Sequence, residues 1–244
     1  MELKIILKQK DKTNFLIKGI NYSYANSIRR LITADVPTLA IEDVSFKKNN
    51  SILYDEIIAH RIGLIPLKTS GADEKSKIVF TFKEKGPGYV YASSLKTKDK
   101  SCKPVHPKMP IVKLLDKQEL EFEATAILGK GSEHMKWSPG TVHFVQEPKI
   151  KINNKSSKFE EYKDKYPSKA FKKGKLDEKN ILNNNLVDAC ECINKDILNI
   201  EYSNENFIFQ VESWGQMSCE VMVKKALEIF NEQLTEFSKL MKKK

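Results

Sequence analysis

Arginine is scarce in this sequence of 244 residues. The three arginines are Arg29, Arg30 and Arg61, and every other strongly basic residue is a lysine. A planar guanidinium forms paired hydrogen bonds that an ammonium group cannot copy. Arginines confined to one window of the chain therefore suggest fixed ion pairs or contacts with a partner. Solvated charges on a helix surface are the alternative interpretation.

Cysteine is also rare, and its spacing predicts no disulfide framework. Such frameworks are typical of much shorter secreted chains with closely spaced cysteines. The sequence therefore predicts free thiols in a reducing, cytoplasmic compartment. The four cysteines are Cys102, Cys190, Cys192 and Cys219.

Long apolar runs are missing. No stretch is long enough to predict a transmembrane helix, and the first residues, MELKIILKQKDK, lack the apolar region of a signal peptide. Hydrophobic residues nevertheless make up 40% of the chain, which is enough to fill a core. We expect a folded protein of two or three compact units.

The net charge of +10 is distributed unevenly along the chain. Residues 149–179 hold eleven lysines and five acidic residues, so an excess of +6 lies in 31 positions. Arginine, the residue that most often reads bases, is absent from this stretch. These lysines are interpreted as a solvated face, or as a surface near nucleic acid or an acidic subunit.

Hydrophobic periodicity predicts a mixed order of helices and strands, and so an α+β fold. A hairpin opens the chain and alternating strands fill its middle, where Leu120, Phe122, Ala124 and Ala126 share one face. Asp55 is expected to cap a short helix that ends at Gly63. The predicted strands are 2–9, 13–18, 38–46, 77–83, 119–128, 141–146 and 206–213, and the helices are 22–34, a short one after 55, and 219–241.

The C-terminal helix carries a regular apolar stripe. Its members recur at steps of four and three residues, which is the seam of a helix that packs against another helix. Packing on a sheet of its own domain is the alternative. The stripe comprises Val223, Leu227, Phe230, Leu234, Phe237 and Met241.

Catalytic and metal-binding patterns are weak. His60 has no nucleophile or orienting acid defined by spacing, and a structural role is favoured. Gly129-Lys130-Gly131 lacks the remainder of a phosphate loop. Cys102 and His106 have the spacing of one ligand pair, but no second pair completes a zinc site. The sequence therefore predicts no catalytic residue, no metal and no cofactor.

Four segments, in order, resemble the D subunit of archaeal RNA polymerase, the counterpart of the bacterial alpha subunit's N-terminal domain and of the third-largest nuclear subunit. They are NSIRRLITADVPTLAIEDV, LYDEIIAHRIGLIPL, GKGSEHMKWSPGTVHF and FIFQVESWGQMS. The resemblance implies a discontinuous dimerisation domain (1–44 plus 201–244), a mainly β insert domain (45–150) and a further segment (151–200).

Residues 151–200 resemble the ferredoxin-like domain that many of these subunits carry. Tyr166 stands before Pro167 where cluster-bearing members have cysteine, and Cys190 and Cys192 are the only thiols in the segment. A four-iron cluster needs four thiolates. We therefore expect a degenerate ferredoxin-like segment that has lost its iron–sulfur cluster.

The function that this resemblance implies is a non-catalytic assembly subunit of DNA-dependent RNA polymerase. It would form a heterodimer with the smaller alpha-like subunit L and bind subunits N and P. It would also dock the second-largest catalytic subunit and contact DNA only through the assembled enzyme. A free-standing basic nucleic-acid-binding module is the alternative. A soluble enzyme is disfavoured, because the sequence shows no nucleophile, base or cofactor motif. The expected L interface is Val223, Leu227, Phe230, Leu234 and Phe237, and the expected docking surface is Asn26, Arg29, Arg30, His60 and Arg61.

Overall fold

The computed structural model describes residues 1–69, 77–99, 101–184 and 186–242. It is a mixed structure of helices and strands that divides into two compact units. The smaller unit comprises Met1–Lys4, Leu16–Tyr22 and Val145–Ile208. The larger unit comprises Ile5–Phe15, Ser23–Phe144 and Phe209–Lys244.

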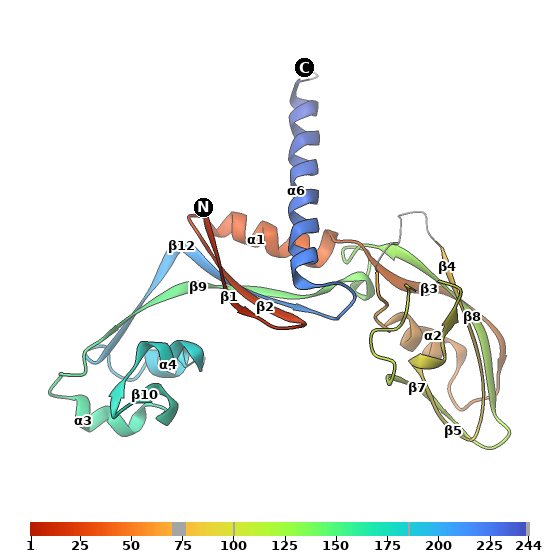
Figure 1. Cartoon of the computed structure of the whole chain (residues 1–244), viewed down its shortest axis with the longest axis horizontal. Helices are drawn as coiled ribbons and strands as arrows, with labels where there is room; N and C mark the ends of the chain where they lie inside the picture. Colours follow the sequence, from red (N-terminus) through yellow and green to blue (C-terminus); the bar gives the residue numbers. More distant parts are fainter. Residues whose placement is uncertain (70–76, 100, 185, 243–244) are drawn as a thin grey trace. The chain divides into compact units, whose positions relative to one another are not determined.

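One four-stranded sheet combines strands from both ends of the chain (Figure 1). Its strand order is β1-β2-β12-β9, so the initial hairpin pairs with the last strand. The hairpin was predicted within one or two residues, whereas β9 and β12 extend well beyond the predicted strands. The bounds are β1 (Glu2–Lys8), β2 (Lys12–Lys18), β9 (Gly140–Ile152) and β12 (Leu198–Ser213).

A second four-stranded sheet, of order β3-β8-β4-β6, forms the centre of the larger unit. The alternation predicted for its central strand is confirmed, because Leu120, Phe122, Ala124 and Ala126 are all buried. A two-stranded sheet of β5 and β7 accompanies it. The bounds are β3 (Thr38–Asn49), β4 (Ile78–Lys85), β5 (Gly88–Tyr91), β6 (Lys96–Thr97), β7 (Pro110–Leu114) and β8 (Glu119–Gly129).

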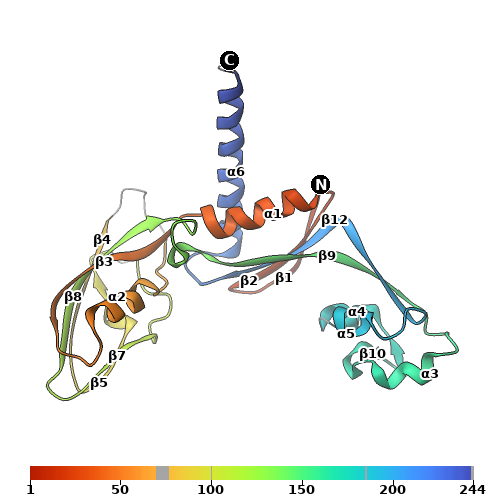
Figure 2. The same ribbon diagram turned by 180° about the vertical axis from the view of Figure 1, so that it is seen from behind.

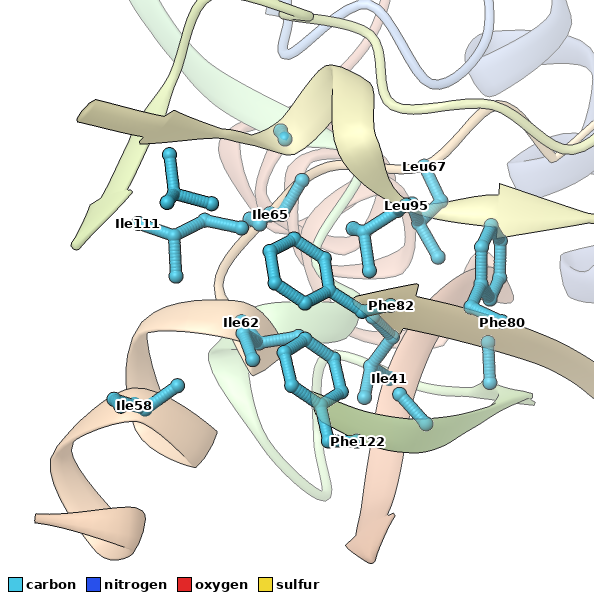
Figure 3. Close-up of a cluster of buried hydrophobic side chains, with 14 of the residues drawn as sticks. Ile41, Ile58, Ile62, Ile65, Leu67, Phe80, Phe82, Leu95, Ile111 and Phe122 are labelled. Atoms are coloured by element: carbon cyan, nitrogen blue, oxygen red, sulfur yellow. The ribbon is translucent and has the colours of Figure 1, made fainter. Parts of the chain in front are cut away.

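The core of the larger unit lies between this sheet and the short helix α2 (Asp55–Gly63). Figure 3 shows Ile58 and Ile62 of the helix in the same cluster as Phe82 and Phe122. All four are at most 2% exposed. The apolar residues of the alternating strands and of this helix therefore meet in one core.

The predicted cap of α2 is wrong. Asp55 is the first residue of the helix, and Tyr54 stands at the cap position without a side-chain hydrogen bond. The Asp55 carboxylate instead accepts a hydrogen bond from Asn49 Nδ2 at 2.6 Å. An acidic residue in the first turn still complements the positive end of the helix dipole.

Helix α1 (Tyr22–Arg30) ends differently from the prediction. It continues into a π-helical turn, η1 (Leu31–Asp35), in which the Val36 amide donates to the Leu31 carbonyl at 3.2 Å. Val36 then adopts an extended conformation, as expected for the residue before Pro37. Such π-helical turns widen the helix locally and are frequent at functional sites.

The smaller unit has a core of its own within 151–200, where the sequence analysis predicted no helix or strand. A short hairpin, β10 (Phe171–Lys172) and β11 (Lys175–Leu176), packs with short helices around it. The buried residues are Phe159, Tyr166, Ala170, Leu176, Ile181, Cys190, Ile197 and Leu198. The helices are α3 (Phe159–Tyr162), α4 (Glu178–Asn183) and α5 (Val187–Glu191), with single turns η4 (Lys163–Lys165) and η5 (Ser168–Ala170).

The last element is the long helix α6 (Cys219–Lys242). Ser218 caps it, because the Val221 amide donates to Ser218 Oγ at 3.4 Å. Two single turns complete the structure, η2 (Ala92–Ser94) and η3 (Met135–Trp137).

Candidate functional site

Helix α6 has two apolar faces with different surroundings. Cys219, Met222 and Ala226 are buried and hold the first half of the helix, which packs beside η1, to its own unit. The predicted stripe is rotated by one residue from this buried face. Within it, Phe230 contacts the ring of Tyr24 at a centroid distance of 5.8 Å, and Val223 is half-buried.

No other part of the described chain covers the second half of α6. Every residue from 231 to 242 is exposed, and Figure 2 shows no element of the same unit alongside this part of the helix. Leu234 is 52% exposed and Phe237 is 63% exposed. Burying a side chain of this size contributes about 1.5–3 kcal/mol, so the exposed end of the stripe is a candidate docking surface.

Strand β1 presents a second apolar surface that the sequence reasoning missed. All seven of its residues are exposed, among them Ile5 at 50% and Ile6 at 52%. It lies at the edge of its sheet, and an exposed apolar edge strand is a ready site for association. An ion pair between Lys8 and Glu220 joins the end of this strand to the first turn of α6. The apolar residues at alternate positions of MELKIILK were the feature of the sequence that could have indicated this surface.

The predicted docking residues of α1 divide into a braced and an unbraced arginine. Arg29 is half-buried and donates to Asn26 Oδ1 from Nε at 3.1 Å and from Nη2 at 3.0 Å. Arg30 is exposed and has neither an ion pair nor a hydrogen bond from its side chain to the described part of the chain. Arg30 is therefore the arginine of this pair that is available to a partner.

The predicted docking residues of α2 are both exposed. Arg61 donates from Nη2 to the carbonyl of Pro110 at 3.1 Å, which fixes one edge of its guanidinium. His60 precedes it, and its imidazole forms no hydrogen bond or ion pair with the residues described. No hydrogen bond or ion pair links these two residues to Arg29 or Arg30 within the described ranges.

A surface hollow of about 310 Å³ lies in the larger unit, and sequence reasoning missed it. Met135 at 64% exposure and Trp214 at 44% exposure present apolar surface to it. Gln216 is 5% exposed, and its Oε1 accepts no hydrogen bond from the described residues. The hollow is lined by Leu64, Pro66, His106, Met109, Met135, Lys136, Ser138, Trp214 and Gln216.

Lys136 holds the wall of this hollow in place. Its Nζ donates to the Ile41 carbonyl at 3.0 Å, pairs with Glu42 and lies 4.4 Å from the centroid of the Trp137 ring. Trp137 in turn donates from Nε1 to the Ile127 carbonyl at 3.2 Å. The segments EHMKWSPG and SWGQMS both line this hollow, although about 75 residues separate them in the sequence.

The thiols do not assemble into a metal site. Among the described residues, no three His, Cys, Asp or Glu side chains are grouped to hold a metal. Burial raises the pKa of the Cys190 thiol in its apolar cluster, whereas Cys192 is exposed. Burial likewise raises the pKa of Cys102, whose Sγ lies 3.6 Å from Asp99 Oδ2. In the described part of the chain, no helix has the length and apolar character needed to cross a membrane.

Comparison with known proteins gives consistent matches over nearly the whole chain. Residues 14–234 match the family described as the RNA polymerase Rpb3/Rpb11 dimerisation domain. The chain is 34% identical to DNA-directed RNA polymerase subunit Rpo3 of Thermococcus kodakarensis, over 94% of this chain and 93% of the relative. It is 35% identical to subunit Rpo3 of Pyrococcus furiosus, over 97% and 95%. It is 31% identical to DNA-directed RNA polymerase II subunit rpb3 of Dictyostelium discoideum, over 96% and 93%.

Proposed function

Because the chain belongs to the RNA polymerase Rpb3/Rpb11 dimerisation domain family, we propose that it is a non-catalytic assembly subunit of a DNA-dependent RNA polymerase. The observation that carries this proposal is the exposed apolar stripe on α6. A helix that leaves Leu234 and Phe237 in solvent has a surface suited to a permanent partner. In this role the chain supplies binding energy and geometry, and the assembled enzyme supplies the chemistry in the cytoplasm.

The partner proposed for the stripe is the smaller alpha-like subunit, L. The interface residues are Val223, Leu227, Phe230, Leu234 and Phe237. Obligate interfaces bury about 2,000–5,000 Å² and are more apolar than transient ones. The exposed edge of β1, tied through Lys8 and Glu220 to the first turn of α6, offers a second apolar area.

A second surface is proposed to dock the second-largest catalytic subunit and the small subunits N and P. Arg30, His60 and Arg61 are exposed and fit this role. Asn26 and Arg29 bond to each other, so they hold the shape of α1 beside that surface. The hollow at Met135 and Trp214 adds an apolar contact of the kind that anchors interfaces.

The proposed organisation is a discontinuous dimerisation domain (1–44 plus 201–244), an insert domain (45–150) and a degenerate ferredoxin-like segment (151–200). The pairing of β2 with β12 supports the first, since it joins the two ends of the chain. The β3-β8-β4-β6 sheet and its core support the second.

The residues of 151–200 do not fit a four-iron cluster, and we propose that the cluster has been lost. The segment offers two thiols, of which one lies in an apolar core and the other on the surface. Tyr166, at the position before Pro167, fills part of the same core. Anaerobic purification followed by iron and acid-labile sulfide analysis tests this proposal, and stoichiometric iron would overturn it.

Co-expression with the candidate L subunit tests the main proposal. Leu234→Asp with Phe237→Asp adds two negative charges to the stripe at positions that contact little of their own chain. Losing two apolar side chains of this size costs about 3–6 kcal/mol of binding free energy, so the complex should weaken by about a hundredfold or more. The measurement is the yield and mass of the complex by affinity co-purification and light scattering.

A matched control is available on the same helix. Lys239→Glu also changes the charge by two, and helical periodicity places it on the side opposite the stripe. This variant should co-purify normally. If the double variant also retains the partner, the stripe is not the interface and the proposal is wrong.

A further inference from the structure

The β10–β11 hairpin concentrates positive charge at a tight turn. Lys173 (φ 52°) and Gly174 (φ 79°) form the two-residue loop, and both have the left-handed backbone of a type I′ turn. Phe171 pairs with Leu176 and faces the core, where Leu176 is buried. Because side chains alternate along a strand, Lys172 and Lys175 project from the opposite, outward face.

The outward lysines are arranged unfavourably for folding. Lys172 and Lys175 are direct cross-strand partners. Like charges at this position destabilise a hairpin, whereas a Lys–Glu pair would stabilise it. With Lys173 between them, three exposed ammonium groups lie within four residues. This cross-strand repulsion lowers the stability of the hairpin, and a bound anion would offset it.

The carboxylates that form ion pairs in the smaller unit do so with other lysines. Glu201 pairs with Lys151, Asp196 with Lys158 and Glu160 with Lys163. Asp177 accepts the Asn180 amide at 3.0 Å as the cap of α4. Among the described residues, no ion pair reaches Lys172, Lys173 or Lys175.

We propose that the β10–β11 hairpin is a binding site for the phosphate backbone of nucleic acid. Lysines are suited to contacts with phosphate that do not depend on sequence, and arginine, the common reader of guanine, is absent from this segment. The site goes beyond the proposed assembly role, because it lies in the unit that the α6 stripe does not use.

Nucleic acid fits this surface better than an acidic protein does. A stable protein partner requires apolar anchors that become buried at the centre of the contact. The apolar side chains of the hairpin, Phe171 and Leu176, point into the core, and the outward face offers ammonium groups alone. A phosphate backbone requires only positive charge at an accessible position.

Salt-dependent binding of the full-length chain tests the site, with a 30-nucleotide single-stranded RNA and a duplex DNA of equal length as probes. Each lost phosphate contact reduces the slope of log K against log salt by about 0.7 for single strands and about 0.9 for duplexes. The triple variant Lys172→Gln, Lys173→Gln, Lys175→Gln should therefore reduce the slope by about 2–3 and weaken binding at 50 mM salt by about tenfold or more.

The smaller unit itself provides the matched control. Lys151→Gln, Lys158→Gln, Lys163→Gln removes the same charge from lysines that already have carboxylate partners. This control should keep most of the wild-type slope, and replacing the three hairpin lysines by arginine should keep the slope in full. All variants should still co-purify with the α6 partner, so failure here is distinguishable from failure of the proposed assembly role.

Two results would overturn the site. Equal loss of binding in the hairpin and control variants would mean that diffuse net charge binds the probes. If the full-length chain binds an acidic polypeptide but neither nucleic acid, the hairpin is a site for a protein partner. Urea unfolding of each variant separates loss of the site from loss of the fold.

Discussion

Phe82 and Phe122 stack across adjacent strands, with ring centroids 4.5 Å apart and an interplanar angle of 7°. They are direct partners in the pairing of β4 with β8, and each is at most 2% exposed. Stacked pairs contribute about 0.5–1.5 kcal/mol beyond the area that they bury. A shift in the register of β4 against β8 would therefore separate these two rings and disrupt the core of the larger unit.

Replacing Phe122 by alanine should strongly destabilise the protein. Removing a buried phenylalanine leaves a cavity and costs about 3–5 kcal/mol of unfolding free energy. Phe122→Leu, which fills most of the volume, should cost clearly less. Val79→Ala is the control. Val79 lies on β4 and is 49% exposed, so its replacement should cost less than about 1 kcal/mol of unfolding free energy. Urea unfolding measures all three, and equal losses for Phe122→Ala and Val79→Ala would contradict the assigned core.

The alternation that placed this pair shows where sequence reasoning succeeds. One face of β8 is buried and the other only half-buried, so period-two spacing specifies the strand and its inward residues. The same argument failed for 151–200, because its buried residues are scattered over short elements at irregular spacing. A helix or strand of only two to six residues is too short to show a hydrophobic period in the sequence.

The candidate site could be predicted only in part for a related reason. Helical spacing predicted the stripe on α6, but periodicity does not show which stretch of a stripe is covered. Tertiary contacts decide this, and they half-bury Phe230 against Tyr24 while leaving Leu234 in solvent. The hollow at Met135 and Trp214 depends on two distant loops meeting, and a single sequence carries no signal for that.

Gly131 should be intolerant of a side chain. A Cβ at this position would lie 2.2 Å from the Thr33 carbonyl oxygen, which belongs to the π-helical turn. The backbone would have to shift, at a cost of about 1–3 kcal/mol. Gly63→Ala is the control, because its Cβ would be 3.5 Å from the nearest atom and alanine favours the helix. Thermal unfolding should show a lower Tm for Gly131→Ala and an unchanged or higher Tm for Gly63→Ala.

Cys192 should react with a maleimide far faster than the other thiols of the folded chain. It is exposed, whereas Cys102, Cys190 and Cys219 are buried. Burial raises the pKa of each of these three thiols, so they remain protonated and less nucleophilic at neutral pH. Mass spectrometry after brief labelling should show a single adduct, which Cys192→Ser abolishes. Rapid labelling of Cys190 would contradict the core of the smaller unit.

Tyr202 should ionise later than an ordinary tyrosine. Tyr202 is 40% exposed, but desolvation of its hydroxyl, and then the hydrogen bond that this hydroxyl donates to Glu191 at 3.0 Å, raise the pKa of Tyr202 to about 12. Its contribution to stability is therefore fully present below the unfolded pKa of about 10 and is lost as the pH rises toward 12. Titration of phenolate absorbance should show a late component that Tyr202→Phe removes. Glu191→Gln should move that component toward lower pH, and an unchanged titration would show that the carboxylate has no part in the shift.

The two halves of α6 should differ in hydrogen exchange when the chain is alone. The first half is held by Cys219, Met222 and Ala226, whereas residues 231–242 pack on nothing in the described structure. An isolated helix of about 12 residues is marginally stable in water, so amides in the second half should exchange almost without protection. Adding the candidate L subunit should slow exchange most in 231–242, because the amides of the first half are already protected. If the second half is already as protected as the first, the chain stabilises α6 by itself. If the partner protects other residues instead, the stripe is exposed for some reason other than dimerisation.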